Sequence, residues 1–335
     1  MKLTPGQEAR FHDAPKVDPE AYQAYLMATY LDWGLYQENS EAQSYLQKAI
    51  QKDPTFALAY SALAGTYAVM AETRRRSPRD VYPPAKQAAH KALELDERSC
   101  ATHKLIANIA WQSDWDWQTA EKEYLHTIEL CPNDKSAHSA YGFYASVMGR
   151  IDLALAEMAK TRELDPIKAE PLQGESVINY QSRNYKALIE VSRSFTASRP
   201  NYWLAYFWLG VGYEGSGRTL EAIPEYQKAV ELAQGDSDAT AALAYAYAAT
   251  GRKAEAQKIL HEWLHRSETS YISPYMIATV YAGFGNKDKA FEYLEKAYEE
   301  RSSDLPYFLR ADLRMDTLRS DPRFQDLIRR MNFPN

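Results

Sequence analysis

Residues 135–168 read KSAHSAYGFYASVMGRIDLALAEMAKTRELDPIK, and the architecture follows from this stretch. Small and large residues alternate at helical spacing in both halves, a Gly149-Arg150 turn separates the halves, and Asp165-Pro166 stands near the end. Glycine enters the left-handed backbone conformation without strain, and it commonly ends helices for that reason. Proline cannot continue a helix. The stretch therefore predicts two helices joined by a tight turn.

The same two-helix pattern recurs with a period of 34 residues. Four of the five turn positions that repeat at this spacing are glycine, and a small residue usually follows five positions later. A fixed period of this length indicates a stacked array of helix–turn–helix units. The turn positions are Gly149, Arg183, Gly217, Gly251 and Gly285, and the following positions are Ala154, Leu188, Ala222, Ala256 and Ala290.

Small residues mark the places where the two helices of a unit cross. Gly142 and Ala154 let the backbones approach, while Tyr141 and Met158 fill the space around the contact. An aromatic residue, a large residue followed by glycine, an alanine on the second helix and a closing proline together resemble the tetratricopeptide repeat. The resemblance implies a right-handed α-solenoid whose first helices face a concave surface, and a protein that binds other proteins.

We predict an all-α solenoid of about eight units over nearly the whole chain. Residues 1–18 lead into the array, residues 19–300 form it, and residues 301–335 depart from the period. We expect this last part, residues 301–335 with its amphipathic helix, to form a cap on the open end of the array. The fifth unit is degenerate, because Leu188 replaces its small residue. The units lie near 20–54, 55–98, 99–134, 135–168, 169–202, 203–236, 237–270 and 271–304.

Bulk composition narrows the function classes. The 335 residues carry a net charge of −6, which argues against nucleic-acid binding because affinity for phosphates comes from cationic surfaces. We expect no membrane span and no secretory leader, since the apolar runs are too short. Cys100 and Cys131 are too few for a disulfide scaffold. We therefore expect two free thiols in a reducing, cytoplasmic compartment, with a bridge within the third unit left open.

A short pattern in the seventh unit matches a zinc-binding motif. His261-Glu262-Trp263-Leu264-His265 places two histidines four apart on one face of a helix, with Glu262 as a base for a zinc-bound water. The apolar residues of this stretch serve packing, and the repeat pattern supplies no third ligand. We therefore predict no metal, no cofactor and no catalytic residue, and keep a small zinc hydrolase as the alternative function.

A cluster of cations interrupts the second unit. Arg74, Arg75, Arg76 and Arg79 lie in an insertion near residues 71–82. Guanidinium groups bind phosphate and carboxylate through paired hydrogen bonds, so the cluster is a candidate anion or partner loop. The competing interpretation is a solvated connection without a ligand.

Aromatic residues on the predicted first helices form the main candidate binding surface. They are interleaved with polar side chains, which suits an extended peptide or an inserted helix. A small-ligand sensor is a further alternative, and rings that only complete the packing of the repeats are the competing interpretation. The groove residues are Asn108, Trp111, Phe143, Tyr180, Phe207, Tyr245 and Tyr275.

Three further segments resemble one group of bacterial proteins. They are the opening residues 3–26, the Asp114–Trp117 turn and the ending near residues 321–328. Together they look like the C-terminal tetratricopeptide region of multidomain regulators that also carry a winged-helix DNA-binding domain, a TolB-like domain, a protein kinase or a nucleotide cyclase. The resemblance implies a non-enzymatic scaffold or sensory module in bacterial signalling or transcription regulation, with a protein or peptide as its partner.

Overall fold

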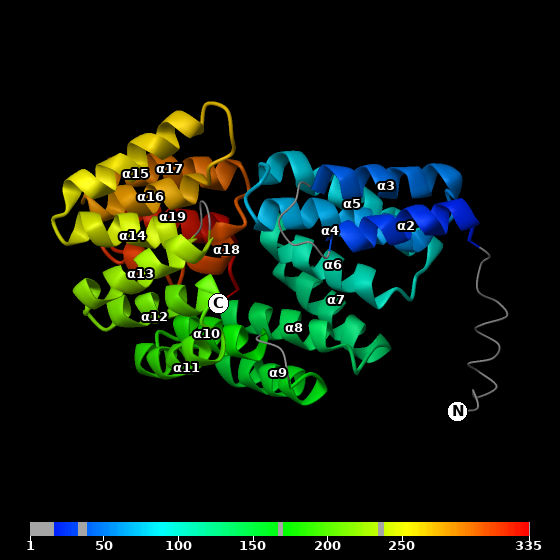
Figure 1. Ribbon diagram of the computed structural model, residues 1–335, viewed down its shortest axis with the longest axis horizontal. Coiled ribbons are helices and arrows are strands. Elements are labelled where there is room, and N and C mark those ends of the chain that lie inside the picture. Colours follow the sequence, from blue (N-terminus) through cyan, green and yellow to red (C-terminus); the bar gives the residue numbers. More distant parts are fainter. Residues whose placement is uncertain (1–16, 33–38, 167–169, 234–237, 335) are drawn as a thin grey trace.

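The computed structural model describes residues 17–32, 39–166, 170–233 and 238–334, and within these ranges it contains helices and turns but no strand. The predicted lead segment, residues 1–18, lies almost wholly outside this described part. Eight helix pairs follow one another along the described chain (Figure 1). The pairs are α2 (Pro19–Asp32) with α3 (Asn39–Lys52), α4 (Ala57–Glu72) with α5 (Pro78–Leu95), α6 (Cys100–Ile109) with α7 (Trp117–Leu130), α8 (Lys135–Val147) with α9 (Ile151–Leu164), α10 (Glu170–Gln181) with α11 (Tyr185–Ser198), α12 (Trp203–Gly215) with α13 (Thr219–Ala233), α14 (Asp238–Ala249) with α15 (Lys253–Arg266), and α16 (Pro274–Gly283) with α17 (Lys287–Glu299).

The turns of the later pairs share one residue in the left-handed conformation. All five positions predicted from the 34-residue period have φ angles between 54° and 84°. Arg183 adopts this conformation without being glycine, and so does Trp115, which stands one period before Gly149. A bulky residue stays there only when its surroundings hold it. The buried Trp115 ring lies 4.8 Å from the ring of Tyr298 and 4.0 Å from the guanidinium of Arg301.

Glycine and alanine lie where the helices of a pair cross, as predicted. A Cβ atom added to Gly142 would come 2.6 Å from Cε of Met158, and one added to Gly210 would come 2.5 Å from the ring of Tyr226. Ala154 is fully buried at the crossing that contains Gly142. A large residue on one helix therefore fills the space that a missing side chain leaves on the other.

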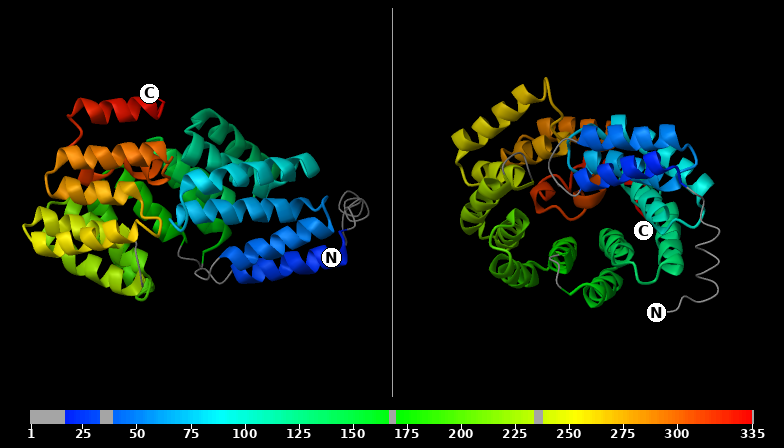
Figure 2. Two further views of the ribbon diagram at one scale, coloured as in Figure 1. Left: turned by 90° about the horizontal axis from the view of Figure 1, so that it is seen from above. Right: turned by 45° about the vertical axis from the view of Figure 1, so that its right-hand side comes forward.

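The array curves until its early and late pairs meet. Figure 2 shows α4 and α5, in blue and cyan, beside the orange segment around α16. At this meeting point Arg74, which follows α4, forms ion pairs with Asp238 at the start of α14 and with Asp304. The contact of Trp115 with Tyr298 joins the third pair to the eighth in the same way. We call the contacts of residues 70–77 with Asp238 and residues 302–304 the seam, because they close the solenoid.

The chain after α17 divides into an inner and an outer stretch. The short helix α18 (Asp304–Phe308) and the 3-10 turn η2 (Leu313–Met315) lie inside the curve of the array (Figure 2). The last helix, α19 (Pro322–Arg330), packs against α17, where Arg323 pairs with Asp288 at 2.9 Å. The assignment of the whole of residues 301–335 to an end cap is therefore corrected. Only the part around α19 lies on the last pair, and residues 302–318, which we call the inner segment, fill the interior.

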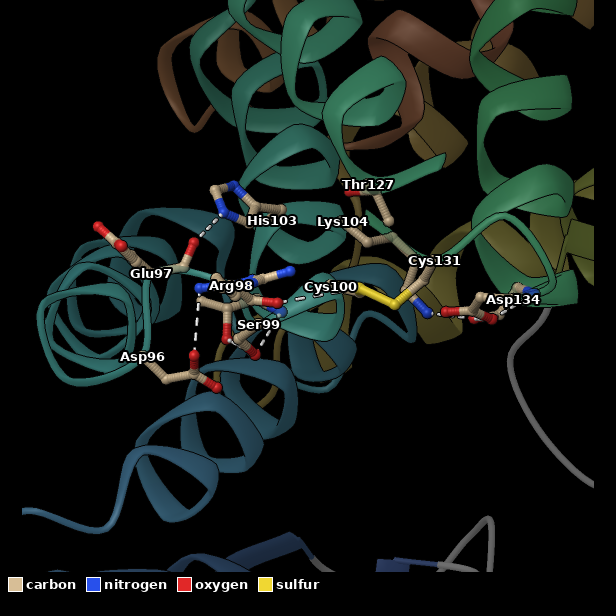
Figure 3. The surroundings of a disulfide bond; sticks show 12 residues. Asp96, Glu97, Arg98, Ser99, Cys100, His103, Lys104, Thr127, Cys131 and Asp134 are labelled. Carbon is tan, nitrogen blue, oxygen red and sulfur yellow. Dashed lines mark hydrogen bonds between the residues drawn. A yellow bond between two sulfur atoms is a disulfide. The ribbon is translucent and has the colours of Figure 1, made fainter. Parts of the chain in front are cut away.

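The two cysteines form a disulfide within the third pair (Figure 3). Cys100 begins α6 and Cys131 follows the end of α7, and their Cα atoms are 6.3 Å apart. The prediction of two free thiols is wrong. Because α6 and α7 run antiparallel, the first residue of the pair and the last one lie side by side, and a bridge between them closes the unit.

Candidate interaction surfaces

The first helices carry all seven residues predicted to line a binding groove. One lies on α6, Trp111 lies in the π-helical turn η1 (Ala110–Asp114) that continues it, and the others lie on α8, α10, α12, α14 and α16. Asn108, Phe143 and Tyr245 are partly exposed. The expectation of an open aromatic groove is corrected, because most of these rings are covered. Those that are at most 3% exposed are Trp111, Tyr180, Phe207 and Tyr275.

The inner segment covers three of these rings with two aromatic side chains of its own. The ring of Tyr307 lies 4.6 Å from that of Trp111 in an edge-to-face arrangement. The ring of Phe308 lies 6.1 Å from Tyr180 and is stacked 6.2 Å from Tyr275. Such offset and edge-to-face pairs stabilise the folded state by more than the burial of their surface area alone. The concave surface therefore holds a peptide segment already, and that segment belongs to the same chain.

Apolar and polar groups of the inner segment are both buried. Leu305, Leu309 and Met315 have no exposed surface. The guanidinium of Arg314 donates to the carboxylate of Asp312 through two nitrogens, at 2.9 Å and 2.7 Å. A buried ion pair of this kind needs further hydrogen bonds to offset its desolvation. One of them comes from Tyr275 on the first-helix surface.

Two first-helix side chains meet this ion pair. The hydroxyl of Tyr275 donates to Oδ2 of Asp312 at 2.7 Å. Glu214 on α12 lines a small cavity with Asp312 and Arg314, and it accepts a hydrogen bond from the hydroxyl of Tyr226 at 2.8 Å. Burial raises the pKa of Glu214 to about 7, and the hydrogen bond from Tyr226 offsets only part of this effect. Its other carboxylate oxygen has no hydrogen-bond partner among the described residues.

Arg74 was predicted to lie in an anion loop, but its side chain is paired at the seam. Its Nη2 atom lies 2.7 Å from Oδ1 of Asp238, and its Nε atom lies 3.1 Å from Oδ1 of Asp304. The hydroxyl of Ser273 also donates to Asp304, at 2.5 Å. Burial raises the pKa of the Asp304 carboxyl, but Arg74 and the hydroxyls outweigh burial and hold the pKa below its ordinary value. Arg74 is therefore a structural residue and not part of a solvated loop.

A cleft of about 1060 Å³ opens beside the seam. Arg75 and Arg76 line it from the α4–α5 connection, and Arg266 at the end of α15 lines it from the opposite side. Arg79 is exposed and does not line the cleft. The predicted cluster of four cations is thus divided: Arg74 is held at the seam at the edge of the cleft, Arg75 and Arg76 line the cleft, and Arg79 lies outside it.

The zinc-binding pattern lies on the outer helix α15 and is open to solvent. The side chain of His265 is 85% exposed and that of Glu262 is 61% exposed, whereas Leu260 and Trp263 are buried against the array. His265 lies 3.7 Å from Glu268. Within the described ranges, no three His, Cys, Asp or Glu side chains come together in a way that suits a metal ion. None of the described helices is long and apolar enough to span a bilayer.

Comparison with known proteins agrees with the helix pairs and their turns. Residues 178–311 match the family model described as tetratricopeptide repeat. The fold is a tetratricopeptide solenoid. Among curated proteins no sequence matches this solenoid significantly. The match begins near the end of α10 in the degenerate fifth pair and ends within the inner segment.

Solved structures resemble this tetratricopeptide solenoid at low sequence identity. The yeast protein Tom70 is 16% identical, with a TM-score of 0.57 over 95% of this chain and 69% of that chain. Human IFIT1, solved as a dimer with PPP-AAAA, is 14% identical, with a TM-score of 0.54 over 77% of this chain and 67% of that chain. A tetratricopeptide repeat protein from Parabacteroides merdae is 13% identical, with a TM-score of 0.49 over 94% of this chain and 100% of that chain. The likenesses to Tom70 and IFIT1 concern the fold alone.

Sequence reasoning missed the residues that hold the interior together. Asp238, Asp304 and Glu214 are acidic residues without a motif, and only the folded chain brings them to Arg74 and Arg314. Asp312 stands two positions before Arg314, but the sequence does not show that this pair is buried. One signal was present, because the apolar run at residues 305–309 stands outside the 34-residue period. The run indicates burial, although it does not say which surface of the array receives it.

Proposed function

We propose that this protein is a non-enzymatic scaffold that binds a protein or peptide partner on the outside of its closed array. The observation that carries the proposal is the filled interior. Tyr307 and Phe308 occupy the concave surface where an array of this kind offers its aromatic side chains. A partner therefore meets the second helices, the turns and the free faces of the end pairs.

The first helix of the array offers one such surface. Tyr22, Leu26 and Tyr30 are 48%, 47% and 78% exposed, and their spacing of four residues places them on one face of α2. Neighbouring exposed apolar side chains on a helix favour contact with another protein. This face supports the proposal because it lies outside the interior that the inner segment fills.

Hydrogen exchange with a purified partner tests the scaffold function. The partner is first isolated on the immobilised full chain, and its binding to the purified protein is then measured by calorimetry. We expect saturable binding with new protection on outer helices and no change in residues 302–318. Release of the inner segment together with protection of the first helices would place the partner in the concave groove instead. Chemical conversion of the partner would contradict a non-enzymatic role.

The cellular setting stays a prediction. The segments that resemble bacterial multidomain regulators support a place in signalling or transcription regulation. The pairing of Cys100 with Cys131 favours an oxidising compartment, because structural disulfides are rare where thiols are kept reduced. A cytoplasmic location therefore predicts that rapid alkylation in intact cells labels both cysteines, whereas an oxidising compartment predicts that neither is labelled.

A further inference from the structure

We propose that the groove between α3 and α5 binds an arginine-bearing segment of the partner protein, with the guanidinium seated over the ring of Tyr67. The proposal rests on the scaffold function and names a recognition site for it. The groove has a volume of about 810 Å³, and residues of α3, α4 and α5 line it (Figure 1). Since α3 and α5 are second helices, the groove belongs to the outer surface where we expect the partner.

The floor of the groove is apolar and partly open to solvent. It comes from α4, which packs against both α3 and α5. Tyr60 and Tyr67 on α4 and Ile50 on α3 are partly exposed, and Leu63 between the two tyrosines is 9% exposed. A ligand in the groove therefore reaches the faces of aromatic rings as well as aliphatic carbon.

The groove is open because the second pair lacks a side chain that other pairs have. In the third pair Glu123 on the second helix lies 2.6 Å from Nδ1 of His103 on the first helix. In the fourth pair Glu157 and His138 are related in the same way, also at 2.6 Å. Both glutamates stand three positions after the alanine of the helix crossing, and Ala88 occupies this position on α5. No carboxylate therefore bridges the two helices of the second pair there.

Tyr67 has counterparts in later pairs that show what covers such a ring. A tyrosine stands three positions after the small residue of the helix crossing in several first helices. In the sixth pair the guanidinium of Arg218 lies 4.5 Å from the ring centre of Tyr213, and in the seventh pair that of Arg252 lies 4.2 Å from the ring centre of Tyr247. Both arginines follow the turn glycine, and both rings are buried.

The second pair does not cover its ring in this way. In the eighth pair Tyr281 stacks with Tyr293 at 5.5 Å, so this pair also supplies a cover of its own. In the second pair an insertion replaces the turn of glycine and arginine, and Arg74 is held at the seam. Among the described residues, no ring and no cation lies over Tyr67. An arginine from a partner fits the place that the chain's own arginines take in the sixth and seventh pairs.

The part of the groove around Tyr67 holds no cation that would repel this arginine. Lys91 lines the groove near the end of α5 and pairs with Glu94 at 2.9 Å. Because α4 and α5 run antiparallel, these two residues lie toward Tyr60 near the start of α4, whereas Pro84 lies toward Tyr67. Tyr60 precedes Tyr67 by seven residues, which is about 10 Å along a helix.

The remaining lining suits arginine better than lysine. Gln47 and Gln87 carry amide oxygens that accept hydrogen bonds from a guanidinium. Leu63 and Ile50 offer aliphatic contact to the methylene stem of the side chain. A guanidinium is planar and weakly hydrated, so it stacks on a ring at a smaller desolvation cost than an ammonium group does.

A labelled peptide with one arginine between two leucines tests the proposal by fluorescence anisotropy. The comparison peptide carries citrulline, which keeps the shape of arginine and lacks its charge. We expect saturable binding of the arginine peptide to the unaltered protein, and an affinity for the citrulline peptide that is about threefold to thirtyfold lower. Equal affinities for the two peptides, or no binding of the arginine peptide, would overturn the proposal.

Variants of the two floor tyrosines locate the bound arginine. We expect Tyr67→Leu to bind both peptides with the affinity that the unaltered protein has for the citrulline peptide, within about twofold. Tyr67→Phe keeps the ring face and should keep the preference for arginine. Tyr60→Leu is the matched control at the other end of the floor, and it should keep the preference as well. Loss of the preference in Tyr60→Leu but not in Tyr67→Leu would contradict the assigned position. Thermal melts without peptide check that each variant is folded.

The Tyr67→Leu variant also separates this proposal from the scaffold function. If the purified partner binds it as tightly as the unaltered protein, the groove is not the recognition site and the scaffold function stands. If the two peptides bind in the predicted order while no protein partner binds, the arginine site is confirmed and the scaffold function is contradicted.

Discussion

Arg74 and Asp304 are 230 positions apart in the chain, and the guanidinium of one holds the carboxylate of the other through Nε and Nη2. Arg74 also reaches Asp238, so one side chain fastens the second pair to the seventh pair and to the inner segment. An open solenoid transmits its stability only between neighbours. This contact adds a connection between pairs that are distant in sequence.

Replacing Arg74 by methionine tests the seam. The change leaves the buried carboxylate of Asp304 and the partly buried one of Asp238 without their cation, and we expect a loss of about 3–5 kcal/mol in the free energy of unfolding. Urea denaturation measures the loss. The control is Arg183→Met, since Arg183 pairs with Asp316 on the surface and both side chains are well exposed. Its expected effect is below about 1 kcal/mol. Similar losses in both variants would show that the seam ion pairs stabilise the protein no more than a surface ion pair does.

Phe207→Ala tests whether the first-helix rings are core residues. Phe207 is 3% exposed, and its removal leaves a cavity, so we expect a loss of about 3–5 kcal/mol in the free energy of unfolding. Leu220→Ala is the control, because Leu220 is 73% exposed on α13. A Phe207→Ala protein with the stability of the unaltered chain would restore the interpretation of an open groove.

Gly210→Ala tests the close crossing of α12 and α13. The new Cβ atom would lie 2.5 Å from the Tyr226 ring, and the resulting strain is expected to cost about 1–3 kcal/mol. Gly65→Ala is the matched control, because Gly65 lies within α4 and its new Cβ atom meets nothing within 4 Å. The control is expected to stabilise by about 0.5–1 kcal/mol, since alanine favours helix. If both substitutions shift the melting temperature in the same direction, the close approach of α12 and α13 at Gly210 is contradicted.

Reduction of the disulfide is expected to destabilise the third pair. The bridge joins residues 31 positions apart, and a loop of this length restricts the unfolded chain by roughly 3–4 kcal/mol. Melting temperature with and without dithiothreitol measures the effect. A Cys100→Ser, Cys131→Ser protein should melt at the lower temperature under both conditions. Two titratable thiols in the unreduced, denatured protein would show that the bridge does not form.

We expect Glu214 to lower the free energy of unfolding as the pH rises from mildly acidic to mildly basic values. Its pKa is about 7 in the folded protein, above its ordinary value of 4.5. Between these values the folded state keeps the proton and the unfolded state has lost it, so raising the pH favours unfolding. The stabilisation is present below about pH 4.5 and is lost as the pH rises through about 7, and its size is on the order of 3 kcal/mol.

The Glu214→Gln variant isolates this contribution. Glutamine stays neutral, so the variant should lack this fall in stability and should gain relative to the unaltered protein from pH 5 to pH 8. Asp312, Arg314 and Tyr226 face Glu214 and are the same in both proteins. Urea denaturation at the two pH values therefore compares like with like. Parallel pH profiles would mean that Glu214 is ionised in the folded state.

Local features of the array could be predicted from the sequence. The turn glycines follow from a backbone conformation that other residues enter at a cost, and Gly142 and Ala154 follow from the space that two crossing helices share. Each of these depends on residues within one unit of 34. The disulfide also depends on residues within one unit. The low number of cysteines led to the wrong prediction of free thiols, whereas the antiparallel pair places its first and last residues, Cys100 and Cys131, next to each other.

The interior could not be predicted in this way. Whether Asp304 meets Arg74 depends on the small rotation between successive pairs, which accumulates over the array before its ends approach. No sequence pattern indicates how large this accumulated rotation is. The groove prediction correctly placed Trp111 and Tyr275 on first helices, and it failed on exposure because Tyr307 and Phe308 return to the same surface.

The inner segment follows all eight pairs in the chain, so the ribosome makes it after them. While the pairs emerge and begin to fold in order, Trp111 and Tyr180 have no cover, because Tyr307 and Phe308 are not yet available. A nascent chain of this protein therefore displays an aromatic surface that the finished molecule hides. Chaperones that bind exposed apolar surface should associate with the growing chain and leave once residues 302–318 have entered.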